Sequence, residues 1–245
     1  MKTITLLSCI YLAGTAAEAS AEQPPPISSC PKPFQGFFLG ANIGYGVGSA
    51  RNHLTKTTNS LFDSKLDFGY NGIDGGLNTG YNYIFDNKFG LGIEFVANWA
   101  NAKAKFNTTI AQNGSHQVIG AGPNLKNSLQ LRANFSYVIY GLVAPKIILG
   151  WDNSLWRRKL NASEAGLPGG DFSLNGQEKS RRNGFLWGLG IDFLVLKHCM
   201  IGFEYTGTIV RKQTLRSVEP VTKNAFVNSL RQQYNKFALV AKFIY

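Results

Sequence analysis

The stretch FGLGIEFVANW, residues 89–99, alternates between two kinds of side chain from its first residue to its last. Every odd-numbered residue is apolar, and three of these are aromatic. The even-numbered residues are two glycines, Glu94, Val96 and Asn98. Successive side chains of a β-strand point to opposite faces. The pattern therefore predicts a strand with one apolar, aromatic face and one small or polar face.

The same alternation recurs in seven other runs, at residues 37–47, 73–83, 129–137, 143–151, 187–195, 201–205 and 237–245. Short connections fall at about 84–88, 139–142 and 196–199, and long ones at about 49–66, 101–127, 152–182 and 207–232. Short turns at one end and long loops at the other are typical of bacterial outer-membrane barrels. The runs also approach the 9–11 residues that a tilted spanning strand needs. We predict an all-β fold, an eight-stranded antiparallel up-and-down transmembrane β-barrel over residues 35–245.

The side that faces outward follows from the composition of the two faces. A soluble eight-stranded barrel would turn its apolar face inward and keep its outer face polar. In each run of this chain, every second residue is apolar or aromatic, whereas the residues between them are mostly glycine, asparagine and charged residues. We call these two alternating sets the two parities of a run. We expect the apolar set to face lipid.

Every charge within the runs, and Lys236 immediately before the last run, falls on the glycine-bearing parity. The acids are Asp74, Glu94, Asp192 and Glu204, and the bases are Arg132, Lys146, Lys236 and Lys242. An eight-stranded barrel is about wide enough for side chains to fill it, and a buried charge without a partner is costly. Four acids against four bases predict a largely plugged, salt-bridged lumen. The alternative is that some of them, Lys146 and Lys236 above all, lie near the barrel ends and are solvated.

The first residues are typical of a secretory signal peptide. Lys2 precedes an apolar stretch at about 4–17, which is too short for a spanning helix. We expect cleavage after Ala21, with Ala17-Glu18-Ala19 as the second choice. Residues 22–34 are rich in proline and predict an extended periplasmic tether.

The chain of 245 residues has a formal net charge of +11. The four long connections hold seventeen basic and six acidic residues, which accounts for the whole excess. Charge spread over four loops, without a helical recognition motif, argues against nucleic-acid binding. A basic loop patch of Arg157, Arg158, Lys159, Arg181 and Arg182 has two interpretations. It contacts the phosphate-rich outer leaflet, or it forms a site for a receptor or polyanion.

Catalytic and cofactor signals are weak. The only histidines, His53, His116 and His198, fall in predicted loops or turns, with no serine or acid beside them on a strand. We therefore expect no enzymatic activity. Haem binding through His53 or His116 has no further support, so we also expect no cofactor or metal. Cys30 and Cys199 fall on the predicted periplasmic side, which is oxidising. They form either a disulfide that pins the tether or two unpaired thiols.

FQGFFLGANIGYGVG (34–48) resembles the opening strand of the opacity-like and OmpA-like small outer-membrane β-barrels, and FGLGIEFVANWANAK (89–103) resembles their third strand, with Glu94 inward. Phe243 and Tyr245 resemble the C-terminal signal read by the barrel-assembly machinery. Phe34 departs from the family, whose members carry tryptophan there. The resemblance implies an outer-membrane location, with extracellular loops and periplasmic termini.

Three functions remain open from the sequence. The first is a structural and surface-interaction role, in adhesion or host contact, with the loops as the working surface. The second is a small passive porin, and the third a lipid-modifying enzyme. We expect a monomer whose partners are outer-membrane lipid and lipopolysaccharide, the assembly machinery, and host or matrix polyanions.

Overall fold

The computed structural model describes residues 33–56, 63–103, 108–112, 115–165, 172–218 and 225–245. Its strands are β1 (Gly36–Lys56), β2 (Asp63–Ile84), β3 (Phe89–Lys103), β4 (Thr108–Gln112), β5 (Ser115–Tyr137), β6 (Val143–Ala165), β7 (Phe172–Leu196), β8 (Cys199–Val218) and β9 (Ala225–Ile244). The predicted signal peptide, almost all of the predicted tether, and Cys30 lie outside the described residues. No helix in the described part of the chain is long and apolar enough to cross a membrane.

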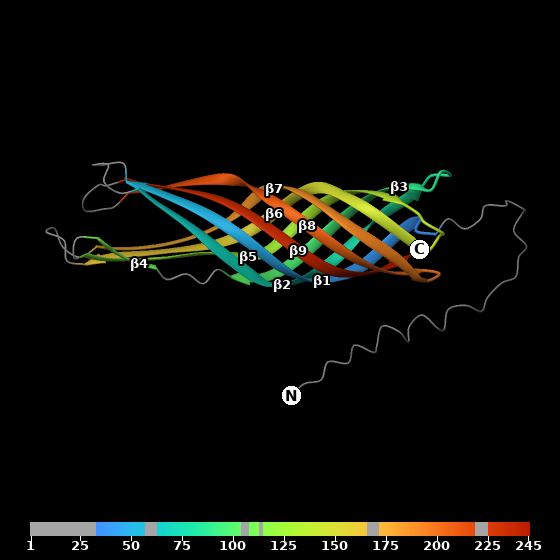
Figure 1. Ribbon diagram of the computed structural model, residues 1–245, viewed down its shortest axis with the longest axis horizontal. Helices are drawn as coiled ribbons and strands as arrows, with labels where there is room; N and C mark the ends of the chain where they lie inside the picture. Colours follow the sequence, from blue (N-terminus) through green and yellow to red (C-terminus); the bar gives the residue numbers. More distant parts are fainter. Residues whose placement is uncertain (1–32, 57–62, 104–107, 113–114, 166–171, 219–224) are drawn as a thin grey trace, which may run out of the picture. The chain divides into compact units, whose positions relative to one another are not determined.

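Eight of these strands form a closed barrel (Figure 1). Neighbouring strands pair antiparallel in the order β3-β2-β1-β9-β8-β7-β6-β5, and pairing of β3 with β5 closes the circle. The short β4 pairs with β5 only, beyond the barrel wall. The eight strands predicted from the sequence are the eight barrel strands, and the predicted fold class is confirmed.

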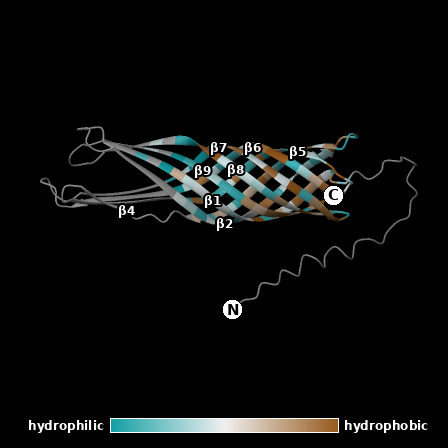
Figure 2. Ribbon diagram, viewed as in Figure 1, coloured by the Kyte–Doolittle hydropathy of each residue, from teal (hydrophilic) through white to brown (hydrophobic). Residues whose placement is uncertain are grey.

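The outer surface of the barrel is apolar. On β1, Phe37, Leu39, Ile43, Tyr45 and Val47 are all exposed, with Ile43 60% exposed near the middle of the run. From Phe37 to Val47 the strand covers roughly 33 Å at ~3.3 Å per residue. At the usual tilt this corresponds to an apolar band about 25 Å tall, the height found in membrane barrels. Figure 2 shows the apolar and polar residues alternating along the barrel strands. Water would be an unfavourable surrounding for this surface, so the barrel spans a membrane.

A ring of polar residues ends the apolar band on the side of the long connections. On each barrel strand, the outward residue next beyond the band is polar. These residues, called the amide ring below, are Ser49, Asn71, Asn101, Asn127, Asn153, Asn183, Arg211 and Asn235. The opposite end of the band carries paired aromatic rings, such as Phe89 with Tyr137 and Phe243 with Tyr245, each pair with centroids 5.1 Å apart. The band therefore has two defined edges.

The long connections differ from the prediction. They were expected to be loops, but most of their described residues continue the strands. β6 and β7 stay paired from Val143↔Phe193 as far as Glu164↔Phe172. Two strands that leave the barrel in register keep their backbone groups hydrogen-bonded by remaining paired. We call these parts the extensions, and the two ends of the barrel the turn side and the extension side.

The extensions separate into two groups (Figure 1). The outermost pair between β7 and β8 is Gly184↔Val210, although both strands continue beyond it. One group holds β4 to β7, and the other holds β8, β9, β1 and β2. The barrel wall is therefore split between β7 and β8 just beyond this pair.

Candidate functional site

The barrel interior is built in three layers, because alternate residues of every strand point inward. The layer at the turn side is apolar. It consists of Phe34, Phe38, Ile84, Val138, Ala144, Met200 and Ile244, all buried. Phe34 adopts a positive φ of 71° as the chain enters β1. This layer closes the turn side of the lumen with packed side chains.

The middle layer holds the eight charges singled out from the sequence, and the structure buries all of them. Glu204 lies at its centre, with its carboxylate 2.7 Å from Nζ of Lys146 and 2.9 Å from Nη1 of Arg132. Lys146 also contacts Asp192 at 2.8 Å. Lys146 is therefore held inside the barrel between two acids, not at a solvated end.

Lys242 joins the remaining members of this network. Its Nζ lies 3.5 Å from Glu94, 3.6 Å from Asp192 and 3.8 Å from Glu204. Lys242 also lies over the Phe38 ring, 4.8 Å from the centroid. Glu94 is completely buried and accepts hydrogen bonds from Asn78 Nδ2 at 2.6 Å and Asn134 Nδ2 at 3.0 Å.

The last two charges pair with each other nearer the extension side. Lys236 Nζ lies 2.7 Å from Oδ1 of Asp74 and donates a hydrogen bond of 2.7 Å to Asn42 Oδ1. Tyr234 donates to Oδ2 of the same aspartate at 3.0 Å. All eight charges thus have partners within the lumen, which offsets much of the cost of burying them.

The layer at the extension side is aromatic and apolar. It consists of Ala50, Tyr70, Ala102, Leu125, Trp156, Val210 and Tyr234. Tyr70 stacks on Tyr234 with centroids 6.0 Å apart, and it meets Trp156 edge-on at 5.5 Å. Glycines on β1 make room for these rings, because a Cβ at Gly46 would collide with Tyr234 and one at Gly48 with Tyr70. This layer closes the second end of the lumen.

Substituting Gly46 with leucine is expected to lower the free energy of unfolding by about 1–3 kcal/mol, the usual cost of overpacking a core. Gly69→Leu is the matched control, because no atom lies within 4 Å of a Cβ built there. Chemical denaturation of the folded barrel in lipid vesicles measures both variants. Adding Tyr234→Ala should restore part of the loss in Gly46→Leu. Strictly additive effects of the two changes would contradict this packing.

Sequence reasoning missed Asp152, a buried acid of the extension-side half. It is almost fully buried, accepts a hydrogen bond of 2.9 Å from Gln130 Nε2, and is also bonded by the Ser154 hydroxyl. It was counted among the loop acids. The signal was present in the sequence, since Asp152 continues the inward parity of Lys146 and Gly150 along one strand.

The basic patch is placed on paired strands, which corrects its assignment to loops. Arg157 and Arg158 lie on β6 and face Lys179 and Glu178 of β7, while Lys159 faces Gln177. Arg181 is exposed and donates a hydrogen bond of 2.8 Å to Asn153 Oδ1. Arg182 has the other parity and pairs with Ser154, whose side chain is buried. Arg181 and Arg182, adjacent on β7, therefore lie on opposite faces of the β6–β7 ribbon.

The remaining sequence candidates are placed as follows. His53 and His116 lie on β1 and β5, not in loops, and His198 lies in the turn before β8, with Nδ1 3.1 Å from the Ile244 carbonyl oxygen. Within the described ranges, no cluster of three or more histidine, cysteine or acidic side chains could hold a metal. Cys199 forms no disulfide with any described residue. Because Cys30 lies outside those ranges, its disulfide stays a prediction. Phe243 and Tyr245 are exposed at the turn side.

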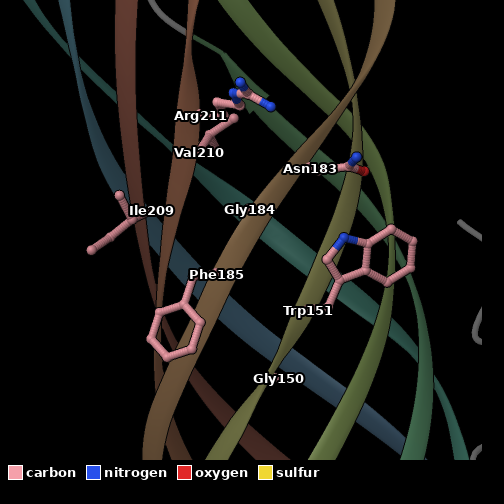
Figure 3. A pocket seen from close by; sticks show the side chains of 8 residues that line it. All are labelled: Gly150, Trp151, Asn183, Gly184, Phe185, Ile209, Val210 and Arg211. Atoms are coloured by element: carbon pink, nitrogen blue, oxygen red, sulfur yellow. The ribbon is translucent and has the colours of Figure 1, made fainter.

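A groove on the outer surface was not anticipated from the sequence (Figure 3). Its volume is about 430 Å³, and it lies on β6, β7 and β8 where β7 and β8 part. The lining residues are Gly150, Trp151, Asn183, Gly184, Phe185, Ile209, Val210 and Arg211. The groove opens on the apolar band at its boundary with the amide ring.

No protein-family model matches the chain, and no curated protein does so either. Solved structures do resemble it. The outer-membrane protease OmpT of Escherichia coli is 8% identical, with a TM-score of 0.48 over 89% of this chain and 99% of that one. OprG of Pseudomonas aeruginosa is 14% identical, with a TM-score of 0.45 over 86% and 97%. Ail, the attachment invasion locus protein of Yersinia pestis, is 12% identical, with a TM-score of 0.32 over 80% and 97%.

At these identities and TM-scores the similarities carry neither a fold nor an activity to this chain. The fold itself is established by the strand pairing that closes the barrel and by the exposed apolar band. The molecule is a small β-barrel of the outer-membrane type, as the resemblance of residues 34–48 and 89–103 implied.

Proposed function

We propose that this chain is a surface-interaction protein of the bacterial outer membrane, with its turn side in the periplasm and its extensions outside the cell. The observation that carries the proposal is the closed lumen. Two apolar layers cover its ends, and the charges between them contact one another. A barrel filled in this way anchors the protein in the membrane, and the extensions are the part that contacts its partners.

The closed lumen weighs against the passive porin. An aqueous path requires charged side chains that line water, as in the wider barrels of porins. Here Lys146 and Arg132 direct their charged groups at Glu204, and Tyr70, Trp156 and Tyr234 pack across the extension side. Buried side chains pack on both sides of the polar middle layer, which supports a closed lumen over a water-filled one.

The refolded protein in a planar bilayer is expected to show no steady conductance. Protein folding in the same lipid must be verified in parallel, so that silence is not mistaken for failed insertion. Long-lived openings in correctly folded protein would contradict the closed lumen and favour the porin.

The surface role is supported by the basic residues of the β6–β7 extension. Arg157 and Arg181 have the same parity on neighbouring strands, on the outward side of the ribbon. Arginine presents a planar fork of donors that suits sulfate, phosphate and carboxylate groups. We infer an anionic polymer of the host or matrix as the partner.

Binding of heparin to the detergent-solubilised protein tests this partner class. The double variant Arg157→Glu and Arg181→Glu is expected to weaken binding by about tenfold or more, equivalent to 1.4 kcal/mol. Arg51→Glu with Arg231→Glu makes the same charge change on the β1–β9 pair and is the matched control. An equal loss in both double variants would mean attraction by net charge alone. Unchanged heparin binding in the Arg157→Glu and Arg181→Glu variant would contradict a binding site on the β6–β7 extension.

A further inference from the structure

The groove on β6, β7 and β8 has an apolar lower part. Trp151, Phe185 and Ile209 form one row across the three strands, because Trp151 pairs with Phe185 and Phe185 pairs with Ile209. Each of the three is about half exposed on the outer surface. Gly150 and Gly184 also line the groove and contribute backbone atoms to its wall. The row of three apolar side chains thus borders a hollow where β7 and β8 part.

The floor of the groove is set by the split in the barrel wall. Gly184 and Val210 form the outermost pair of β7 and β8, and both line the groove. Val210 is buried and belongs to the apolar layer that closes the extension side of the lumen. The hollow therefore leads from the apolar band to an apolar floor, so its occupant should be apolar at that point.

The upper rim of the groove is polar and cationic (Figure 3). Arg211 is the only cation of the amide ring, and it lines the groove together with Asn183. Asn183 accepts a hydrogen bond of 2.7 Å from Asn153 Nδ2, and Asn153 in turn accepts one of 2.8 Å from Arg181. Exposed Lys212 follows Arg211 on β8. The positive charges of Arg211 and Lys212 would attract an anionic group at this level of the membrane.

We propose that this groove seats one lipid A molecule of the outer leaflet, with an acyl chain against Trp151, Phe185 and Ile209 and a phosphate at Arg211. The occupant has to come from the membrane, because the groove opens onto the apolar band. It has to carry an anion where the band ends, because that is where the rim places its cations. The choice of lipid A rests on the orientation proposed above, which puts this rim in the outer leaflet.

A soluble polyanion fits the groove less well than a lipid. It could contact Arg211, but it would leave the row of three apolar side chains uncovered. The proposed lipid site therefore differs from the β6–β7 surface proposed for heparin, because its cation, Arg211, lies on β8. The two sites are separable by substitution, since Arg157 and Arg181 do not line the groove.

Native mass spectrometry of the purified protein in a neutral detergent, titrated with bis-phosphorylated lipid A, tests the proposal. We expect one lipid per chain in the unaltered protein and about tenfold weaker binding in Arg211→Glu, which loses a charge-assisted contact. Ile209→Trp, which fills the hollow without adding charge, should also weaken binding. Arg231→Glu, an exposed arginine on β9, is the matched control and should bind as the unaltered protein does.

Three results would contradict the proposed lipid A site in the groove. The first is an equal loss of lipid A binding in Arg211→Glu and Arg231→Glu, and the second is unchanged binding in both groove variants. The third is equally tight binding of dephosphorylated lipid A or of phosphatidylglycerol. Because the protein is in detergent, the measurement detects the seat whichever side the extensions face. Its failure is therefore distinct from failure of the heparin or conductance experiments.

Discussion

Replacing Glu204 with leucine is expected to lower the free energy of unfolding by about 3–5 kcal/mol, the cost of breaking a buried ion pair by removing one partner. Glu204 is the acid closest to two cations at once, Lys146 at 2.7 Å and Arg132 at 2.9 Å. The substitution leaves Lys146 with Asp192 alone and deprives Arg132 of its nearest carboxylate. Urea unfolding of the barrel in lipid vesicles, followed by tryptophan fluorescence, measures the change.

Asp152→Asn is the control for the Glu204 substitution. Asp152 is buried to a similar degree, but its hydrogen-bond donors are the neutral groups of Gln130 and Ser154. The amide keeps an acceptor for them, so the loss should be clearly smaller. A loss under about 1 kcal/mol in Glu204→Leu would show that water replaces the missing carboxylate, because exposed ion pairs contribute no more than that.

Replacing Ile43 with arginine is expected to cost about 2–4 kcal/mol in a bilayer, because it places a charge at the middle of the apolar band. Ile43 is exposed on the outer surface, so in a water-soluble barrel the same change would be close to neutral. Asn71→Arg, in the amide ring, should cost only about 0–1 kcal/mol near the interface. Equal losses at the two positions would contradict the assignment of the band.

The sequence was sufficient for the barrel because its signal is local. A period of two can be read within a single run, as in residues 89–99, and eight such runs with alternating connection lengths define the topology. The same parity pointed to Glu94, Arg132 and the other interior charges, which the structure buries and pairs. Composition alone could not have located them, because the charges of the extensions are more numerous.

The extensions were missed because the strand prediction followed apolar alternation, which ends with the membrane. Pairing continues beyond it, since backbone hydrogen bonds need no apolar side chain. Tyr70, Trp156 and Tyr234 were left out of the interior for this reason, although each continues the inward parity of its strand. The groove is a different case. Trp151, Phe185 and Ile209 come together through the register of three strands, and register between strands cannot be read from any single one.

The pairing of β1 with β9 has a consequence for how the barrel forms. Phe38 pairs with Ile244 and Lys56 with Phe226, so the first and the last strands of the barrel are hydrogen-bonded neighbours. Contacts of such large sequence separation give a high contact order, which slows folding. Until the last strand arrives, β1 exposes an unpaired edge that can join to another chain. The nascent protein should therefore depend on a chaperone that shields this edge, and its yield on refolding should fall steeply as its concentration is raised.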